Sequence, residues 1–499
     1  MDKRNGALGA LAKINMQHYD IIIIGGGAVG CSIAYILGKH ILDIALLERN
    51  PDVAMGTSGK NSAVVHAGFN NRPGSLMAKL CVEGNKRFGK ICTALDVPYK
   101  CTGKLVVGFN DDDMTIIDKI INNGKKNGCV GLSHINPKEM TTLEPGVPGV
   151  GALFSANTAI FDPFLYTIHL CEASIQNGAS FFMNNEVKSI KKEKKSFIVV
   201  TNLDEFKCEI LVNSAGLFAD KVAAMAGDPS FIIYPCKGEY LILDTDAGKL
   251  LSRPVYPVPR PGIGGLGVHL TVTVDGNILI GPSAEYINDN EDYSTTASML
   301  NILFREAKVL LPSLQEDMII GAYAGIRPKL VSMGQVNYGD FIIEESPRVE
   351  NLINLIGIES PGLTASIPIA EEVVKIIKNK IKLRPNTKFK EKYKAALRFS
   401  SLNYKKQNEI ILQNVDYGEI VCRCKTITKA EVLGAINNPL KAHSIASIKN
   451  RIRTTSGRCQ GGYCLTKLTD ILMAELKIPP EEIQYRYCDD APFPGRAKL

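Results

Sequence analysis

Residues 21–30 read Ile-Ile-Ile-Ile-Gly-Gly-Gly-Ala-Val-Gly, and Glu48 follows eighteen positions later at the end of a second apolar run. Four consecutive β-branched residues predict a buried parallel strand. The glycines after them let a helix begin so close to the strand that its amides can meet a pyrophosphate, while the Glu48 carboxylate can accept hydrogen bonds from a ribose. The stretch therefore predicts a dinucleotide site. Its expected members are Gly25, Gly27, Ala28, Val29, Gly30, Glu48 and Arg49.

Three later stretches of small residues, at 57–62, 213–216 and 360–364, indicate a long cofactor. Hydroxyls and small side chains in the first suit a backbone that passes close to a flat ligand and bonds phosphate or ribityl oxygens. The last stretch starts a helix, whose N-terminus can stabilise the negative charge that a flavin develops on reduction. FAD is therefore favoured over NAD. The further expected contacts are Thr57, Ser58, Asn61, Ser62, Val187, Ala215, Gly216, Arg327, Gly357, Pro361, Gly362, Leu363 and Thr364.

Residues 231–345 are rich in strand patterns and are expected to cover the cofactor and to carry the substrate. Arg327 precedes a proline and lies close to Lys329, so the two cations suit capture of a carboxylate or phosphate, although a surface salt bridge also explains such an arginine. His66 and His269 fall in candidate stretches and either can take a proton, whereas a lone histidine is more often structural. The candidate catalytic residues are His66, His269, Arg327, Lys329, Lys237 and Tyr240.

Length and periodicity predict an α/β fold with a Rossmann-like FAD-binding domain, an interleaved mixed-sheet substrate domain and a small helical C-terminal domain. The 499 residues, 45% of them hydrophobic, exceed what one core usually serves. Strands are expected at 21–24, 104–109, 197–201, 207–211, 240–243, 269–274, 278–280 and 352–358. Helices are expected at 76–95, 114–127, 164–177, 296–310 and 365–378.

The cysteine count and the hydropathy restrict the compartment. Thirteen cysteines, an odd number with no signal peptide before them, argue against a secreted disulfide scaffold and for a reducing, cytoplasmic location. No run of about eighteen apolar residues occurs, so no membrane-spanning helix is expected. Peripheral contact with the inner face of a membrane stays open.

Charge is distributed unevenly along the chain. Residues 378–409 carry eleven basic and two acidic side chains, and residues 419–477 carry ten and four. This basic C-terminal third is expected to meet an acidic partner, a membrane surface or the acidic body of the same molecule, while a solvated linker is the plainer interpretation of 378–409. Nucleic acid is not an expected partner.

Four cysteines form two pairs within a short stretch: Cys422 and Cys424 have one residue between them, and Cys459 and Cys464 have four. Two such pairs of thiolates can hold a zinc ion or a binuclear iron–sulfur cluster, and the one-residue spacing favours iron, because structural zinc more often uses wider spacing. Thr428 is expected to cap a following helix, and Cys464 to begin another.

Together these motifs resemble the FAD-dependent oxidoreductases of the D-amino-acid-oxidase superfamily over about residues 19–380. Within that superfamily, Tyr256–Pro259 and Gly267–Thr271 are similar to L-2-hydroxyglutarate oxidases, whereas Ala322–Lys329 is similar to glycerol-3-phosphate dehydrogenases. The four cysteines resemble the bacterioferritin-associated-ferredoxin-like (BFD-like) [2Fe–2S] module, and Arg458–Cys464 looks like the end of the A subunit of anaerobic glycerol-3-phosphate dehydrogenase.

The resemblance implies a division of the chain into several parts. These are an extension at 1–17, an oxidoreductase domain at 18–380, a basic linker at 381–418, a BFD-like domain at 419–477 and a tail at 478–499. Within the oxidoreductase domain the FAD-binding parts are about 18–95, 155–228 and 340–380, and the substrate parts are about 96–154 and 229–339.

The function implied is that of an FAD-dependent dehydrogenase of a small anionic hydroxy compound, with glycerol 3-phosphate favoured and L-2-hydroxyglutarate, another 2-hydroxy acid or an amino acid as alternatives. Electrons are expected to pass singly through the [2Fe–2S] cluster of Cys422, Cys424, Cys459 and Cys464 to a partner subunit, a quinone-linked acceptor or another flavoprotein. An alternative of another class is an electron-transfer or docking subunit whose cysteines bind zinc.

Overall fold

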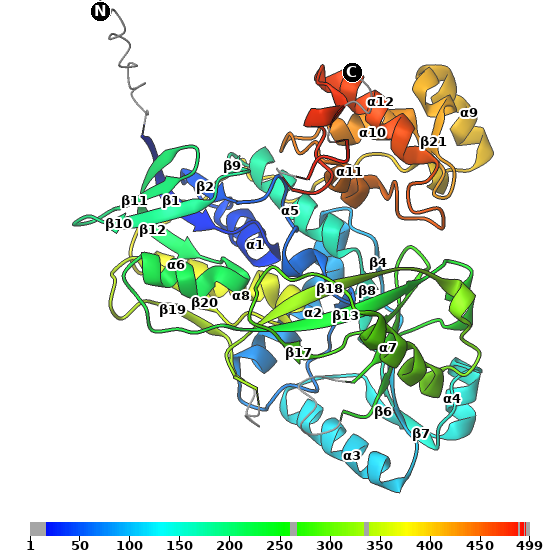
Figure 1. Cartoon of the computed structure of the whole chain (residues 1–499). Helices are drawn as coiled ribbons and strands as arrows, with labels where there is room; N and C mark the ends of the chain where they lie inside the picture. Colours follow the sequence, from blue (N-terminus) through cyan, green and yellow to red (C-terminus); the bar gives the residue numbers. More distant parts are fainter. Residues whose placement is uncertain (1–15, 260–266, 334–338, 488–489, 494, 496–499) are drawn as a thin grey trace, which may run out of the picture.

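The Ile21–Ile24 run lies inside strand β1 (Gln17–Ile24), which pairs in parallel with β2 on one side and β12 on the other. The computed structural model describes residues 16–259, 267–333, 339–487, 490–493 and 495 (Figure 1). Most of the expected N-terminal extension, and part of the expected tail, therefore lie outside the described residues. All four isoleucines are buried, as expected of a central parallel strand.

The first sheet has eight strands in the order β10-β11-β12-β1-β2-β9, with β20 beside β12 and β19 beside β20. Strands β11 and β20 share the far edge of β12, where β11 pairs with its first half and β20 with its end. Besides β1, the strands are β2 (Ile44–Leu47), β9 (Ser180–Phe182), β10 (Val187–Lys192), β11 (Phe197–Thr201), β12 (Glu205–Asn213), β19 (Ile342–Glu345) and β20 (Leu352–Ile356).

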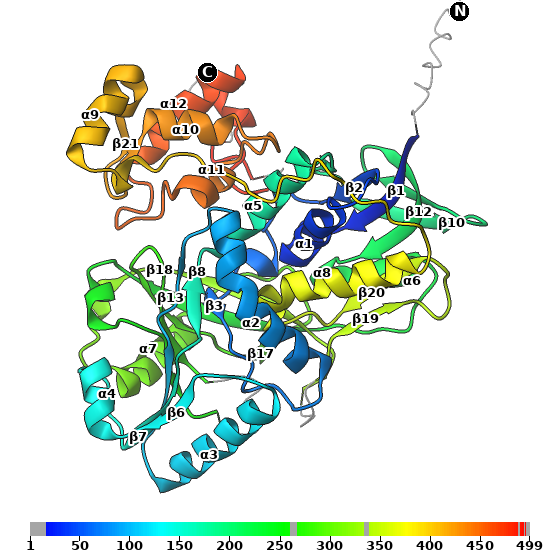
Figure 2. The ribbon, with the colours of Figure 1, turned by 180° about the vertical axis from the view of Figure 1, so that it is seen from behind.

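Helices α1 (Ala28–Leu37), α5 (Pro163–Gln176) and α8 (Gly362–Lys378) cover one face of this sheet and share the largest core of the molecule. Helix α2 (Leu76–Ala94) packs on α8, as Figure 2 shows from behind. The short helix α6 (Ala219–Met225) follows β12 on the other face. A sheet centred on β1, with three helices on one face and α6 on the other, confirms the expected Rossmann-like architecture.

A second, nine-stranded sheet has the order β17-β13-β16-β15-β14-β5-β7-β6, with β18 beside β13. Its strands are β5 (Lys104–Gly108), β6 (Leu132–Ile135), β7 (Gly151–Ser155), β13 (Tyr234–Leu243), β14 (Val255–Pro257), β15 (His269–Val272), β16 (Ile278–Gly281), β17 (Glu285–Tyr286) and β18 (Ile319–Lys329). Helices α3 (Asp111–Lys126), α4 (Pro137–Leu143) and α7 (Ala297–Leu310) accompany it. A small sheet of β3 (Val64–Val65), β8 (Ala159–Phe161) and β4 (Tyr99–Lys100) lies between the two large ones.

Strand β18 is the main element that the sequence pattern missed. It runs the length of β13 and pairs with no other strand among the described residues, so it forms an edge of the sheet. An edge strand tolerates Pro328 and the glycines at 321 and 325, which argue against a strand when the sequence is read alone.

The C-terminal residues form a separate small core. It is built from β21 (Ile420–Cys422), β22 (Ile427–Thr428), α10 (Lys429–Ile436), α11 (Ile445–Ile452) and α12 (Cys464–Leu476). The Thr428 side chain caps α10 and the Glu431 side chain returns a bond to the Thr428 amide, which confirms the expected cap. No described helix is both long enough and apolar enough to cross a membrane.

The range expected to be a linker is mostly exposed, but two side-chain contacts attach its first half to the FAD-binding part. The hydroxyl of Tyr35 donates to the carbonyl of Glu391, and Tyr393 bonds to Glu172, so this part of the chain lies along α1 and α5. Helix α9 (Tyr404–Gln413) follows and lies at the outer side of the C-terminal module (Figure 1). The first half of this segment is thus a solvated stretch that is attached to the oxidoreductase domain at a few points.

Buried ion pairs hold the C-terminal module on the FAD-binding part. Arg451 of α11 donates to both carboxylate oxygens of Asp52, and Arg453 pairs with Asp162 at the start of α5 and with Asp275 at 2.8 Å. Asp52 and Asp162 are completely buried. The basic C-terminal third thus meets the acidic body of its own molecule, one of the three partners that its charge predicted.

We expect Arg451→Met to destabilise the docked module by about 3–5 kcal/mol, because it leaves the Asp52 carboxylate buried without its cation. Urea unfolding followed by circular dichroism measures the effect. Lys249→Met is the matched control, since Lys249 pairs with Asp246 at the surface and should change stability by less than about 0.5 kcal/mol. Equal urea midpoints for Arg451→Met and the wild type would show that the pair does not hold the module.

Candidate active site

A cavity of about 650 Å³ lies between the two large sheets. Its wall includes the ends of β1, β2 and β12, the loop at 55–62 and the start of α8 on one side. Strands β5, β13, β14, β15 and β18 contribute residues from the other side. The carboxyl ends of parallel strands and a second sheet above them form the position at which α/β proteins bind nucleotides.

The glycine turn brings α1 close to the end of β1. Gly25 has a φ of +109°, and a Cβ on Gly30 would lie only 2.1 Å from the Gly25 carbonyl oxygen. Gly25, Gly27, Ala28 and Val29 line the cavity as expected, whereas Gly30 does not. The role of Gly30 is to let helix and strand touch.

Glu48 is fixed by bonds to both of its carboxylate oxygens. Oε2 accepts from the Gly26 amide at 2.6 Å, and Oε1 accepts from the amide and side chain of Asn50 at 2.9 and 2.7 Å. Burial raises the pKa of Glu48, while these donors act in the opposite direction. Beside it, Arg49 lies over the ring of Phe218 and pairs with Glu291 at 2.8 Å. Val187 lines the same end of the cavity.

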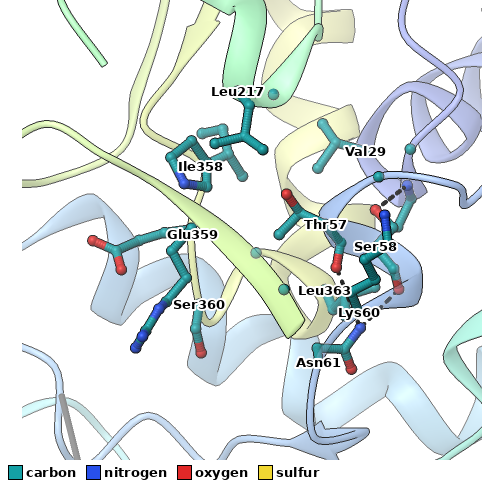
Figure 3. Close-up of a pocket in the computed structure, with 18 of the residues that line it drawn as sticks. Val29, Thr57, Ser58, Lys60, Asn61, Leu217, Ile358, Glu359, Ser360 and Leu363 are labelled. Atoms are coloured by element: carbon teal, nitrogen blue, oxygen red, sulfur yellow. Dashed lines mark hydrogen bonds between the residues drawn. The ribbon is translucent and has the colours of Figure 1, made fainter. Parts of the chain in front are cut away.

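The loop at 57–62 is tied to both sides of the cavity (Figure 3). The Ser58 hydroxyl oxygen accepts from the Ala28 amide at 2.9 Å, and the Thr57 hydroxyl donates to the Ile326 carbonyl at 2.8 Å. Asn61 donates to the Ser58 carbonyl at 2.7 Å and closes the turn. These bonds hold the polar loop over the start of α1, where its hydroxyls and those of Ser62 face the cavity.

Helix α8 begins at the cavity. Pro361, Gly362, Leu363 and Thr364 all line it, and no side chain caps the first amides. The Gly362 amide donates to the Glu359 carbonyl at 2.6 Å, and the helix terminus carries a partial positive charge. Gly357, by contrast, does not line the cavity; its φ of +69° and its contact with Leu330 give it a structural role. Ala215 and Gly216, just after the end of β12, also line the cavity.

His269 lines the cavity and has one ring nitrogen without a described hydrogen-bond partner. Its Nδ1 lies 3.0 Å from the Gly267 carbonyl oxygen, which can only accept, so Nδ1 carries the proton and Nε2 has a lone pair. Nε2 is buried and has no hydrogen-bond partner among the described residues. The ring stacks on Tyr256 with centroids 3.7 Å apart. Burial lowers the pKa of His269 to about 3, so the imidazole is neutral.

His66 lies at the same end of the cavity. Its Nε2 is 3.3 Å from the Ser360 hydroxyl, and its amide donates to the Thr364 hydroxyl at 3.0 Å. Burial lowers its pKa to about 3 as well, with a further contribution from Lys104. The structure therefore brings both candidate histidines to one region, and only His269 has its tautomer fixed by a carbonyl.

Lys104 is a cavity residue that the sequence did not single out. It stands at the start of β5 with only 1% of its surface exposed, and its ammonium lies 4.1 Å from the centre of the Tyr256 ring. Burial lowers its pKa to about 7. A lysine at the start of an apolar strand was the available signal, but the sequence does not show which way it faces.

The remaining candidates differ in position. Arg327 lines the cavity and donates to the Ser283 carbonyl at 2.7 Å, which orients its guanidinium. Lys329 also lines it and pairs with Glu359 at 3.1 Å. Tyr240 lines it too, but Lys237 does not: its ammonium pairs with Asp292 at 2.7 Å outside the cavity wall. Residues three apart in a strand face opposite sides, so Lys237 and Tyr240 cannot both point inward.

The four cysteines come together in two pairs, each with one member from either segment. The sulfur atoms of Cys424 and Cys459 are 3.5 Å apart, and Cys422 is hydrogen-bonded to Cys464. That bond, with backbone amides, lowers the pKa of Cys422 to about 6. No group of three or more His, Cys, Asp or Glu among the described residues could hold a single metal ion. Two pairs of thiols surrounded by amides fit a binuclear cluster, which needs two thiolates on each iron.

The cavity likewise fits FAD. It joins a fixed carboxylate at one end to the start of α8 and an unpartnered imidazole nitrogen at the other. An α/β dinucleotide fold with a substrate sheet above it and a paired-thiol module defines a flavoprotein oxidoreductase that carries an iron–sulfur domain.

Comparison with known proteins gives the family. The model of the FAD dependent oxidoreductase family (DAO) matches residues 20–376, and that of the BFD-like [2Fe-2S] binding domain matches residues 420–474. The chain therefore belongs to the FAD-dependent oxidoreductases of the DAO family and ends in a BFD-like [2Fe–2S] domain. The expected fold, both expected cofactors and the expected class of enzyme are confirmed.

Three similar proteins stand out. A glycerol 3-phosphate dehydrogenase of Caloramator mitchellensis is 36% identical over 471 residues, which cover 93% of this chain and 96% of that protein. A mitochondrial L-2-hydroxyglutarate dehydrogenase of Arabidopsis thaliana is 31% identical and covers 74% of this chain and 85% of its own length. The dithionite-reduced L-α-glycerophosphate oxidase of Mycoplasma pneumoniae, solved with FAD bound, superposes with a TM-score of 0.71 at 29% identity and covers 77% of this chain and 100% of its own.

We expect Glu48→Ala to lower the affinity for FAD by about 10–100-fold, because it removes the acceptor of the Gly26 amide and leaves that donor unpaired, a loss of about 1–3 kcal/mol. Equilibrium dialysis of the apoprotein against FAD measures the affinity. Glu209→Ala, on the exposed side of β12, is the matched control and should bind FAD as the wild type does. Unchanged affinity in Glu48→Ala would place the nucleotide elsewhere.

Proposed function

We propose that the protein is an FAD-dependent glycerol-3-phosphate dehydrogenase that passes electrons singly through its [2Fe–2S] domain. The observation that carries this proposal is the similarity to the Caloramator enzyme. That similarity extends over 93% of this chain, so it reaches beyond the FAD domain into the cysteine module. The L-2-hydroxyglutarate dehydrogenase of Arabidopsis is similar over a smaller share, 74%.

The charges at the inner end of the cavity support an anionic substrate. Lys104 and Arg327 line this end, and no described carboxylate pairs with either of them. A buried cation without a counter-ion is costly, and a bound phosphate offsets that cost with two negative charges. Lys329 is already neutralised by Glu359. We therefore assign phosphate capture to Lys104 and Arg327.

His269 is the residue that we propose takes the hydroxyl proton of the substrate. Its Nε2 is unprotonated, buried and without a described partner, His269 lines the cavity, and the Gly267 carbonyl holds the opposite nitrogen in its protonated form. As the ring gains a proton, this carbonyl and the phosphate beside Lys104 stabilise the new positive charge. FAD, when bound, supplies the acceptor for the hydride that leaves the carbinol carbon.

His66 serves the same end of the site in a supporting position. The Ser360 hydroxyl and the Thr364 hydroxyl hold its ring and its amide. The Tyr256 ring stacks on the His269 ring and holds its orientation. The faces of the Tyr256 and Phe69 rings lie against the Lys104 ammonium. These contacts exclude water from the cations and strengthen their interaction with an anion.

L-2-hydroxyglutarate is the second candidate, because the same two cations can bind a carboxylate and the Arabidopsis enzyme is 31% identical. Anaerobic mixing of the purified holoprotein with each compound decides between them. Glycerol 3-phosphate is expected to bleach the flavin absorbance, and L-2-hydroxyglutarate to leave it oxidised. If only L-2-hydroxyglutarate bleaches the flavin, that compound is the substrate and glycerol 3-phosphate is not.

The proton on Lys104 predicts a dependence on pH. Below about pH 7 the ammonium is charged and attracts the phosphate; above it the free enzyme loses this charge. We therefore expect kcat/KM for glycerol 3-phosphate to fall as pH rises through about 7. Lys104→Met should lower kcat/KM by about 10–100-fold at pH 6, the value of one charge-assisted hydrogen bond, and remove this fall.

Steady-state kinetics from pH 5.5 to 9 measure both effects. Lys100→Met, an exposed lysine on the neighbouring β4, is the matched control and should keep the wild-type profile. An unchanged profile in Lys104→Met would assign the titration to another group.

A further inference from the structure

We propose that the stacked rings of Tyr240 and Tyr323 form the route by which electrons leave the cavity for the cysteine module. The proposal rests on the proposed function in one respect, that electrons delivered in the cavity pass on through the [2Fe–2S] domain. It does not depend on which substrate delivers them.

One face of β18 connects the cavity with the cysteine loop. Side chains alternate along a strand, so Gly321, Tyr323, Gly325 and Arg327 share one face. At one end Arg327 lines the cavity. At the other, a Cβ on Gly321 would lie 3.7 Å from the side-chain oxygen of Gln460, which directly follows Cys459. Tyr323 is the only large side chain between these ends on that face.

The two tyrosines bridge this face to the cavity wall. Tyr240 lies directly opposite Tyr323 in the β13–β18 pair and lines the cavity. Their rings are parallel, with centroids 4.7 Å apart and an interplanar angle of 3°. The Tyr323 hydroxyl donates to the Asn61 carbonyl at 2.8 Å and so is held against the polar loop of the FAD site. The two rings therefore fill the space between the 57–62 loop and the β13–β18 strand pair with aromatic atoms.

The loop that contains Cys459 is held at the end of the β13–β18 strand pair. Arg458 lies 3.7 Å from Asp244, the residue after the end of β13, and Arg453 pairs with Asp275 in the turn between β15 and β16. The pair Cys424 and Cys459 is the exposed one of the two pairs, and Cys459 directly precedes Gln460, whose side chain lies next to Gly321. The buried ion pairs therefore fix the module where the tyrosine face ends.

The transfer is a movement of single electrons in which no covalent bond forms or breaks. Of the two electrons that one substrate molecule delivers, one reduces the cluster and the other stays behind until an external one-electron oxidant has emptied the cluster. Both tyrosines remain neutral phenols, because burial raises the pKa of Tyr240 to about 12 and also raises that of Tyr323. The rings act as the medium between donor and acceptor and are not themselves oxidised.

The test compares Tyr323→Leu with Tyr323→Phe. Each anaerobic holoprotein is mixed rapidly with whichever compound bleaches the wild-type flavin, and two signals are followed: the flavin absorbance and the electron paramagnetic resonance of the reduced cluster in frozen samples. We expect both variants to bleach at the wild-type rate, since Tyr323 does not line the cavity. Cluster reduction should slow by about tenfold or more in Tyr323→Leu and stay near wild type in Tyr323→Phe, which keeps the ring.

Several outcomes separate this proposal from its neighbours. Cluster reduction at the wild-type rate in Tyr323→Leu overturns it. Slowing in Tyr323→Phe as well would overturn the assignment to the ring and point to the hydrogen bond with Asn61. Failure of glycerol 3-phosphate to bleach the wild type contradicts the proposed substrate alone. If Tyr323→Leu does not retain FAD and the cluster, Tyr323→Val, which suits a strand, takes its place under the same criteria.

Discussion

The site depends on how closely three backbone segments approach one another at the end of β1. The Gly25 carbonyl touches the first turn of α1, and the Ser214 hydroxyl at the end of β12 donates to the Ile24 carbonyl at 2.9 Å. A side chain on Gly25 or Gly30 would force these segments apart. Because they touch, the amides of α1, the carboxylate of Glu48 and the turn after β12 border one continuous cavity. The cofactor contacts that we expect from the first sheet depend on that approach.

Buried charges divide this molecule into a structural set and a chemical set. Arg451 and Arg453 are buried against carboxylates, and their desolvation is offset within the chain, so they position the cysteine module. Lys104 and Arg327 face the cavity and have no carboxylate partner in the part of the chain that the structure describes. The desolvation of these two is left for a ligand to offset. The cost of burying a charge is thus met by carboxylates where the domains join, and we propose that it is met by an anion at Lys104 and Arg327.

The sequence predicted the parts of the site that depend on local chemistry. The glycine turn, Glu48, the 57–62 loop and the start of α8 all lie where strand and helix patterns placed them, because backbone conformation is fixed by neighbours in the chain. Lys104, the Tyr240–Tyr323 stack and strand β18 were missed, because each depends on pairing between distant strands. Because side chains alternate along a strand, the sequence alone could have shown that Lys237 and Tyr240 face opposite sides of the sheet.

The cysteines show the same limit and a consequence of it. The sequence spacing suggests that Cys422 pairs with Cys424 and Cys459 with Cys464. In the structure each cysteine of the first segment instead lies beside a cysteine of the second. Cys422 is the last residue of a buried strand, whereas Cys424 lies beyond the strand and is exposed. The two thiols therefore have different partners despite their one-residue spacing. Neither segment can therefore present a pair until both have folded around the core of Val421, Ile448 and Leu468. Cluster binding and folding of this module are thermodynamically linked, and cluster loss should loosen the surface that docks on the FAD domain.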